Sequence, residues 1–463
     1  MKTTPEALFQ TLRTWRRMPA RALRERAQIS GPTLMRAIQA LGDQVVTRGK
    51  ARRAAYAARR ALRGESAPLT LYRIDEKGRG TEAAMLDLIY PAGCALAFKG
   101  EFEWPLPGDM HDGWFDGIPY PLDDMRPQGF LGRNFARLNA DLLQVPADPL
   151  DWSEDHVFWA LSIFGADQPG NYILGAAAYR RFLASIQDPP HFLDDDQIAE
   201  SYSEQARAAL NFGVGGSSAG GEFPKFTACR MQGDVPVHVI VKFSGDDKSA
   251  GTQRWADLLV CEHLALRTVA DHLDMAAAQS AIHQFDGRTF LEVQRFDRHG
   301  MFGRSGVCSW ASINAALFGL TAKSWASGAD HLLQQGMIEQ ATAQGVRRLC
   351  HFGQLIANSD MHDGNLAFRP SPDGVAGLRL APVYDMLPMH YAPMRGVELP
   401  PRQFTPTLPL PSEQQDWQVA CAAAIAFWLL AADDVRISAA FRKTCAQNAK
   451  ILRQLGGDTA AAM

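Results

Sequence analysis

The segment Asn358-Ser-Asp-Met-His-Asp-Gly-Asn365, followed by Ala381-Pro-Val-Tyr-Asp385, is the most informative part of this 463-residue chain. A carboxylate at Asp360 precedes an amide at Asn365, and a second carboxylate, Asp385, follows an apolar step. These groups are the minimal set for phosphoryl transfer in protein-kinase-like folds, where one aspartate receives the hydroxyl proton and the other two groups hold Mg²⁺. The spacing therefore predicts a kinase.

The residues around this segment separate a catalytic loop from an ordinary turn. A solvated turn rich in Asp and Asn is the alternative, and such turns are common. However, residues 349–356 are apolar and helix-like, residues 366–368 are strand-like, and residues 380–384 lead into Asp385. The order of helix, loop, strand, loop, strand and Asp is that of a kinase catalytic segment, which favours the functional interpretation.

Length and composition predict a globular protein of two or three domains. Apolar residues make up 46% of the chain, and the formal net charge is -3. The seven cysteines form no Cys-x-x-Cys pair, which favours a reducing compartment and predicts a cytoplasmic location. The longest apolar run, Val419 to Ala432, is too short to span a bilayer, so we expect a buried core helix and no membrane partner.

The first 64 residues are strongly basic. They carry 15 Lys and Arg against three acidic residues, so the rest of the chain is acidic. This asymmetry predicts a DNA-binding segment attached to an acidic body. An Arg-rich, acid-poor start without a secretory signal also resembles a mitochondrial transit peptide, which we rank lower.

Three short helices are expected in this basic segment. Leu8, Leu12 and Trp15 share one helical face, residues 22–27 form a second helix, and residues 32–41 form a third. The third helix directs Leu34, Ile38 and Leu41 inward at helical spacing and ends at Gly42. Its outward positions are Thr33, Arg36, Ala37 and Gln39.

A basic β-hairpin with its turn at Gly49-Lys50 follows the third helix and is similar to the wing of winged helix-turn-helix domains. Residues 1–64 are therefore predicted to be a small winged helix-turn-helix domain that binds double-stranded DNA. A solvated three-helix cap, or a module that docks on another protein, is the alternative; the arginine density of the wing favours DNA. The predicted DNA-binding residues are Thr33, Arg36, Arg48, Lys50, Arg52 and Arg53.

An acidic cluster lies in the loop-rich stretch that follows. Its spacing fits no EF-hand pattern, so a solvated loop is expected rather than a metal site. The members are Asp109, Asp112, Asp116, Asp123 and Asp124.

Residues 213–221 contain five glycines and enclose Ser217 and Ser218. Glycines allow backbone amides to close around phosphate oxygens, although the stretch is not a Walker A motif. Downstream, Lys242 ends the apolar strand 237–243 and is placed to reach ATP phosphates. Glu262, on the apolar helix 254–269, is a natural ion-pair partner for Lys242, although it could instead lie on a polar helix face.

The order of these motifs resembles the HipA family of toxin-type serine/threonine kinases. The resemblance rests on Ser218-Ala-Gly-Gly-Glu222, on Gln294-Arg-Phe-Asp-Arg298 and on the two segments quoted first. It covers roughly residues 65–455, and the chain is most similar to a subgroup with its own amino-terminal helix-turn-helix.

The resemblance implies roles for individual residues. Asp360 would be the catalytic base, Asn365 would act beside it, and Asn365 and Asp385 would hold Mg²⁺. Gln294 and Phe296 would line the adenine hinge, and phosphorylation of Ser217 or Ser218 would expel the glycine loop, because a second phosphate cannot share a site made for ATP phosphates. His362 stands beside Gly364, where many relatives carry a lysine. The expected ATP-binding residues are Lys242, Glu262, Gln294, Phe296, Gly220, Gly221, Lys225 and His362.

The expected fold is α+β: a two-lobed protein-kinase-like body, similar to HipA, behind a winged helix-turn-helix domain. The expected divisions are 1–64, an amino-terminal lobe 65–298, a helical carboxy-terminal lobe 299–455 and a flexible tail 456–463. The expected activity is transfer of the ATP γ-phosphate to a protein, with Mg²⁺; the family implies targets in translation such as aminoacyl-tRNA synthetases, and a homodimer is possible. The alternatives are a DNA-binding regulator with an inactive kinase-like body and a small-molecule kinase.

Overall fold

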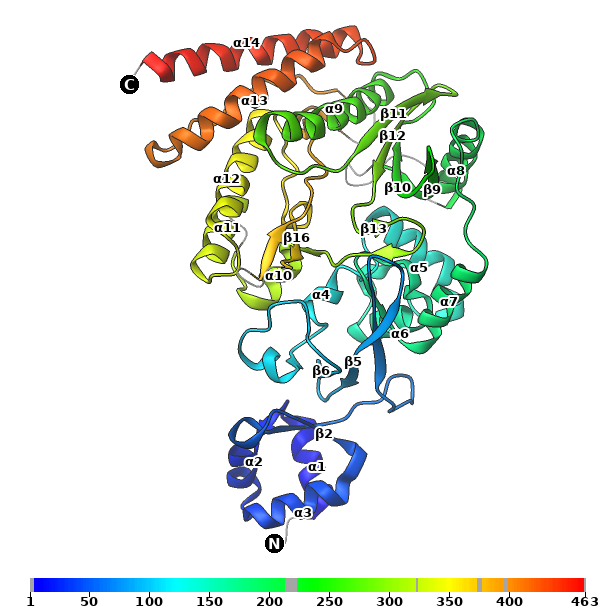
Figure 1. The fold of residues 1–463 in the computed structure, drawn as a ribbon, viewed down its shortest axis with the longest axis vertical. Helices are drawn as coiled ribbons and strands as arrows, with labels where there is room; N and C mark the ends of the chain where they lie inside the picture. Colours follow the sequence, from blue (N-terminus) through cyan, green and yellow to red (C-terminus); the bar gives the residue numbers. More distant parts are fainter. Residues whose placement is uncertain (1–3, 213–222, 322–323, 373–376, 395–398, 462–463) are drawn as a thin grey trace.

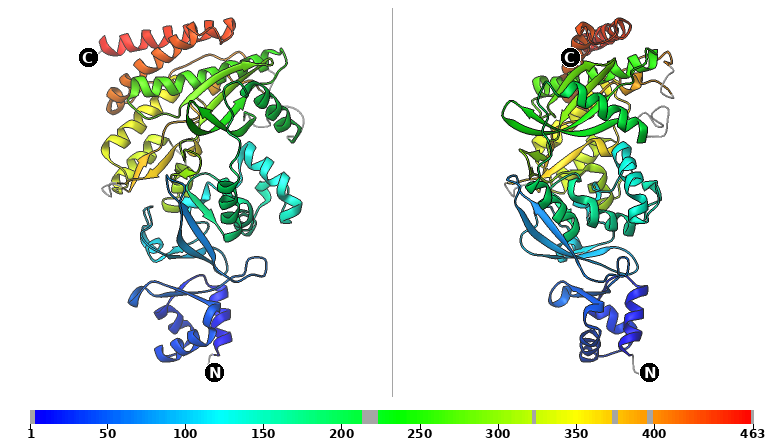
Figure 2. Two further views of the ribbon diagram at one scale, coloured as in Figure 1. Left: turned by 45° about the vertical axis from the view of Figure 1, so that its right-hand side comes forward. Right: turned by 90° about the vertical axis from the view of Figure 1, so that its right-hand side faces the viewer.

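The computed structural model describes residues 4–461 except 213–222, 322–323, 373–376 and 395–398. The molecule is elongated, with the first 64 residues at one end and the two last helices, α13 (Gln414–Asp433) and α14 (Ala439–Ala461), at the other (Figures 1 and 2). Residues 65–187, which we call the middle domain, lie between the amino-terminal domain and the two lobes.

The amino-terminal domain contains the three expected helices and the expected hairpin. The helices are α1 (Pro5–Thr14), α2 (Ala20–Ala27) and α3 (Gly31–Leu41), and the strands pair in the antiparallel order β1 (Met18–Pro19), β3 (Ala55–Ala58), β2 (Val45–Arg48). Gly42 ends α3 with a φ of 52°. Gly49 turns the hairpin at a φ of 79°, where a side chain would collide with the Arg53 carbonyl.

Two positions in this domain correct the expected helix faces. Leu8 and Leu12 are buried, but Trp15 lies beyond the end of α1 and stays 47% exposed, with Arg26 stacked over its ring at 3.8 Å. Ala37 was expected outward and is buried, because its small side chain packs in the domain core beside Leu34. A cation–π contact on a surface ring and the packing of a small side chain in a domain core are both tertiary effects that helical periodicity does not predict.

The middle domain is built on a five-stranded antiparallel sheet in the order β7-β6-β5-β4-β8. Its strands are β4 (Leu69–Ile74), β5 (Gly80–Leu88), β6 (Cys94–Phe98), β7 (Trp114–Phe115) and β8 (Tyr172–Leu174). The accompanying helices are α4 (Tyr120–Asp123), α5 (Gly129–Leu143), α6 (Glu154–Phe164) and α7 (Ala176–Gln187). Among the described residues, no strand of this sheet pairs with a strand of the four-stranded sheet that follows it in the chain. The span 65–298, expected to be one amino-terminal lobe, therefore holds two separate sheets.

The second sheet is four-stranded, in the order β11-β12-β10-β9. It consists of β9 (Lys225–Gln232), β10 (Val235–Phe243), β11 (Ser280–Phe285) and β12 (Arg288–Gln294), with α8 (Ile198–Phe212) and the long α9 (Ala250–Leu273) packed beside it. The apolar alternation of 237–243 explains β10, whose Val237, Val239 and Val241 side chains are buried. This sheet and α9, drawn in green in Figure 1, form the lobe that follows the middle domain.

The carboxy-terminal lobe is mainly helical. It contains α10 (Trp310–Leu317), α11 (Trp325–Gln334), α12 (Gln340–Leu355), α13 and α14, with a small sheet of β15 (Cys308–Ser309), β16 (Ala367–Pro370) and β17 (Leu378–Leu380). Two-residue strands β13 (Arg298–His299) and β14 (Gly303–Arg304) precede it. The backbone of α14 is helical to Ala461, and the flexibility expected from residue 456 stays a prediction.

Helix α13 confirms the expected core helix. By length and composition it is the single helix among the described residues that passes for a membrane span, over Pro411–Asp433. It packs against α9, α12 and α14, and Trp417, Phe427 and Trp428 are fully buried. The apolar residues of α13 are therefore explained by their packing in the protein core.

Candidate active site between the lobes

Lys242 lies at the centre of a buried ion-pair cluster. Strand β10 directs its ammonium toward α9, where Nζ donates to both Glu262 carboxylate oxygens at 2.7 and 2.8 Å. Nζ also pairs with Asp385, which follows β17 in the other lobe. Lys242 and Glu262 are 6% and 1% exposed, so the predicted ion pair is confirmed and three segments far apart in sequence meet at one cation.

The charge states in this cluster are interdependent. Burial raises the pKa of Glu262 to about 7, against the opposing effect of Lys242. Burial would also raise the pKa of Asp385, but the Lys242 ammonium lowers it to about 2. Asp385 holds a φ of 52°, a left-handed conformation that is rare outside glycine and that marks functional sites. The cluster therefore keeps one carboxylate ionised and the other poised to titrate near neutral pH.

The predicted catalytic loop is a compact turn between α12 and β16. Asn365 is buried, and its Nδ2 donates to the Asp360 carbonyl at 2.9 Å, which closes the loop on itself. The Asp360 side chain is exposed at the surface of this turn. Tyr384 supports the loop, because its hydroxyl donates to the Gly364 carbonyl at 2.6 Å. The expected order of helix, loop, strand and Asp is confirmed.

His362 takes part in the backbone geometry of this loop. Its Nδ1 accepts a hydrogen bond from the Gly364 amide at 3.1 Å, and its carbonyl accepts one from the Trp325 indole at 3.2 Å. The His362 ring therefore caps the short turn at Asp363–Asn365. Its predicted contact with phosphate stays a prediction.

A cleft of about 630 Å³ opens between the two lobes beside Lys242. Lys225 lies directly across the β9–β10 ladder from Lys242, and both side chains line the cleft. Asp385 and Gly364 line it from the carboxy-terminal lobe. Glu262 is placed behind Lys242, and Asp360, Asn365 and His362 lie outside the lining.

The predicted hinge forms the inner edge of this cleft. Gln294 ends β12, and its amide donates to the Gln279 carbonyl at 2.8 Å. Phe296 packs against Tyr384 with ring centroids 5.7 Å apart, and its carbonyl accepts a hydrogen bond from Arg369. Both residues line the cleft, so the structure brings the hinge, Lys242 and Asp385 into one cavity.

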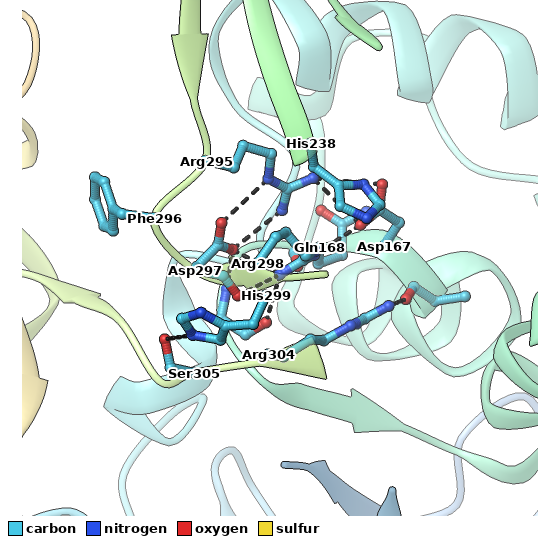
Figure 3. Close-up of polar contacts among 12 residues, drawn as sticks. Asp167, Gln168, His238, Arg295, Phe296, Asp297, Arg298, His299, Arg304 and Ser305 are labelled. Carbon is cyan, nitrogen blue, oxygen red and sulfur yellow. Dashed lines mark hydrogen bonds and ion pairs between the residues drawn. The ribbon is translucent and has the colours of Figure 1, made fainter. Parts of the chain in front are cut away.

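The charged residues next to the hinge contact the middle domain, and Arg295 and Asp297 also line the cleft. Figure 3 shows Arg295 and Arg298 paired both with Asp297 and with Asp167, which belongs to the short turn before β8. Sequence reasoning missed Asp167, because no local pattern links it to a motif more than 120 residues away. The middle domain also supplies Gln128, Leu131 and Asn134 of α5 to the wall of the cleft.

The predicted phosphate loop lies outside the described residues. Gly220, Gly221, Ser217 and Ser218 all fall within 213–222. Their predicted roles are unchanged by the structure.

The predicted DNA-binding residues divide into two groups. Arg36, Lys50, Arg52 and Arg53 are exposed, and Thr33 is half-buried at the start of α3. Arg48, in contrast, donates to the Leu96 carbonyl at 2.9 Å and pairs with buried Asp87. Its guanidinium is committed to the junction with the middle domain, which corrects the expectation that it faces DNA.

The expectation that the acidic loop is only solvated is also corrected, because three of its aspartates pair with arginines of the amino-terminal domain. Arg16 pairs with Asp116 at 3.4 Å, Arg53 with Asp112 at 3.5 Å, and Arg17 with Asp109. The second face of the wing sheet is covered as well, because Val46, Ala55 and Ala57 pack on Ile89, Ala95 and Trp114. Part of the positive charge in residues 1–64 therefore holds the domain against the body.

The two remaining members of the acidic cluster lie near the cleft. Asp123 pairs with Arg126 at 3.2 Å, whereas Asp124 accepts hydrogen bonds from the Ser309 and Ser312 hydroxyls at 2.6 and 2.9 Å. These bonds fix α10 to the middle domain. No group of three or more potential metal-ligating side chains occurs among the described residues.

Comparisons with known proteins cover almost the whole chain. The family model of the YjjJ-like toxin middle domain matches residues 65–183, and that of the HipA-like C-terminal domain matches residues 217–454. Toxin YjjJ of Escherichia coli (strain K12) is 35% identical over 434 residues, which is 94% of each chain.

Solved structures with a similar fold are more distant in sequence. A chain of the Shewanella oneidensis MR-1 toxin–antitoxin complex of HipA, HipB and operator DNA superposes with a TM-score of 0.50 at 16% identity, covering 85% of this chain and 96% of that chain. This likeness supports the two-lobed fold. The Helicobacter pylori proinflammatory kinase CtkA gives a TM-score of 0.34 over 49% of this chain and 90% of its own, too low to support a conclusion.

Proposed function

The chain belongs to the YjjJ-like toxin family and carries its HipA-like, kinase-like body, and on this premise we propose that it is an ATP-dependent serine/threonine protein kinase. One observation carries the proposal. Lys242, paired with Glu262 and Asp385, lies in the cleft that the hinge closes at its inner edge. Positioning and electrostatic stabilisation supply most of the catalysis in phosphoryl transfer, and this cluster provides both.

Each residue has a defined task in this proposal. Lys242 and Lys225 neutralise phosphate oxygens at the mouth of the cleft, and Glu262 holds Lys242 in place. The hinge backbone at Gln294–Phe296 orients adenine. Asp360, exposed on its closed loop, accepts the hydroxyl proton of the substrate.

The donor atoms of Asp385 and Asn365 suit a Mg²⁺ ion in their chemistry. Asp385 is ionised at neutral pH, and Asn365 uses its Nδ2 to close the loop, which leaves its Oδ1 without a hydrogen bond among the described residues. Carboxylate and amide oxygens are the ligands that Mg²⁺ prefers. A bound ion would neutralise negative charge on the transferring phosphate.

Two further parts of the proposal concern regulation. Phosphorylation of Ser217 or Ser218 in the glycine loop would add charge where ATP phosphates bind and so switch the kinase off. The exposed basic residues of α3 and the hairpin tip would bind double-stranded DNA. The Shewanella HipA structure, which contains operator DNA, supports DNA as a partner by analogy.

A DNA-binding regulator with an inactive kinase-like body is the second candidate. The exposed arginines of the amino-terminal domain favour it, but the intact set of Lys242, Asp360, Asn365 and Asp385 argues against loss of activity. A small-molecule kinase would use the same four residues.

A comparison of phosphoproteins separates the protein-kinase proposal from the two other candidates. Cells that express the wild type are compared with cells that express Asp360→Asn at equal protein level, by quantitative phosphopeptide mass spectrometry. The proposal predicts serine or threonine phosphorylation of a small set of cytoplasmic proteins in the wild type alone. Identical phosphopeptides in both samples would reject the protein-kinase proposal.

A further inference from the structure

The charged residues of Gln294-Arg-Phe-Asp-Arg298 have a structural partner that the proposed chemistry does not explain. They flank Phe296 on both sides, and Figure 3 shows their side chains turned toward the middle domain. Arg295 donates to both Asp297 carboxylate oxygens at 3.1 Å. We call Asp167, Arg295, Asp297 and Arg298 the hinge clasp.

Asp167 is the contribution of the middle domain to the hinge clasp. Its Oδ1 accepts from Arg298 Nη2 at 2.7 Å and from Arg295 Nη1 at 3.2 Å. Arg295 and Arg298 are 8% and 2% exposed, whereas the Asp167 side chain is 59% exposed and lines the cleft. A carboxylate from outside the kinase lobes therefore shares with Asp297 the pairing of two buried guanidinium groups next to the hinge.

Backbone contacts reinforce this connection. Arg298 donates to the carbonyls of Gly170 and Gln168 at 2.9 and 2.7 Å, and the Gly170 amide donates to Asp297 at 2.9 Å. Burial alone would raise the pKa of Asp297, but Arg295 and Arg298 hold it below its usual range. Charged hydrogen bonds thus run in both directions across the joint, which is the condition for buried charges to be tolerated.

We propose that Asp167 and Arg298 are positioning residues of the nucleotide site, through which the middle domain fixes the hinge from outside the two lobes. This inference rests on the proposed function. Adenine recognition through backbone groups requires the hinge to be held within about 0.5 Å of its productive position. The hinge clasp supplies that constraint, because Arg295 and Asp297 are the covalent neighbours of Phe296 and both are anchored.

Two variants probe the hinge clasp, and a third variant is the matched control. Asp167→Asn removes the charge, and Arg298→Lys keeps a charge but loses the fork that reaches two carbonyls; Arg298 does not line the cleft, so its effect is indirect. Asp246→Asn is the control, because Asp246 is likewise 61% exposed and pairs with a buried arginine, Arg288, at 2.7 Å outside the cleft lining.

The first readout needs no nucleotide. Amide hydrogen exchange of the peptide covering residues 294–298 is measured for the full-length proteins. Exchange should become at least fivefold faster in Asp167→Asn and Arg298→Lys and stay unchanged in Asp246→Asn. Unchanged hinge exchange in both clasp variants would overturn the inference whether or not the protein binds ATP.

The second readout is the dissociation constant of a non-hydrolysable Mg·ATP analogue, measured by calorimetry below the unfolding temperature of every variant. Both clasp variants should bind about tenfold more weakly, with the control close to the wild type. Wild-type affinity in the clasp variants, together with a lowered unfolding temperature, would show a merely structural role and overturn the inference. Absence of binding by the wild type, with faster hinge exchange in the variants, would reject the proposed function while the clasp stands.

Discussion

At the scale of single residues, the site depends on how one lysine is shared between two carboxylates. Lys242 pairs with Glu262 on α9 and with Asp385 of the opposite lobe, so the two ion pairs form together only when the two lobes are placed as in this structure. Leaving either carboxylate buried without Lys242 would be costly. Lys242 therefore links the two lobes and also lines the cleft in which we propose that ATP phosphates bind.

The raised pKa of Glu262 predicts a pH dependence. Because burial raises this pKa to about 7, acidification below pH 7 adds a proton and removes one charged partner of Lys242. We expect kcat/KM for ATP to fall as the pH drops from 8 to 6. The effect on the free energy of unfolding has the opposite sign. The folded state binds the Glu262 proton more tightly than the unfolded chain does, so the contribution of Glu262 to stability is lost as the pH rises from 4.5 to about 7.

The variant Glu262→Gln tests this assignment. The amide mimics the protonated form, so kcat/KM should be low and nearly flat between pH 6 and 8. Asp246→Asn serves as the control and should keep the wild-type profile. The same inflection in Glu262→Gln as in the wild type would assign the titration to another group.

At the scale of elements, periodicity and motif order predicted much of the local structure. The strand ending at Lys242, the α9 helix and the loop between α12 and β16 occur where the sequence places them. Each has a strong local signal: alternation, a long apolar face, or a fixed spacing of Asp and Asn. The predicted environments of Trp15 and Ala37 were wrong, because Trp15 lies beyond the end of α1 under Arg26 and Ala37 packs in the domain core, and helical spacing predicts neither.

Long-range pairing limited what the sequence could reveal about the site. Arg48 looks like a wing arginine in sequence, and only the fold shows that Asp87 and the Leu96 carbonyl hold it. Asp167 carries no local signal at all. A carboxylate that pairs across more than 100 residues is indistinguishable in sequence from a solvated one.

The division of arginines predicts which element contacts DNA. Arg36 on α3 is exposed, and replacing it with Ala should weaken duplex binding and reduce the slope of log K against log salt by about one counterion. Arg48→Ala should leave the slope unchanged, because Arg48 is bound to the middle domain. Fluorescence anisotropy of a labelled duplex over a salt series measures both. A reduced slope for Arg48→Ala would contradict this division.

At the scale of the whole molecule, the amino-terminal domain is fixed to the body rather than tethered to it. Asp87 is 3% exposed and pairs with both Arg48 and Arg59, the latter at 2.9 Å. Apolar packing between the wing sheet and the middle domain surrounds this pair. The middle domain in turn reaches the hinge through Asp167, so it is the structural link between the predicted DNA-binding face and the cleft.

Removal of the Asp87 carboxylate should weaken this link. Asp87→Ala leaves two largely buried arginines without a carboxylate partner, and we expect the free energy of unfolding to fall by about 3 kcal/mol. Denaturant unfolding followed by fluorescence measures the loss. Glu25→Gln, which breaks the exposed pair with Arg21, should leave the free energy of unfolding close to that of the wild type, because solvent screens an exposed pair. Equal losses in the two variants would show that the junction does not depend on Asp87.

Intact mass spectrometry of the purified protein after incubation with Mg·ATP shows whether the cleft around Lys242 transfers phosphate. We expect a mass increase of one phosphate in the wild type, located by peptide mapping at Ser217 or Ser218, and none in Asp360→Asn. An unmodified wild type that still binds ATP, or equal phosphorylation of Asp360→Asn, would contradict this expectation.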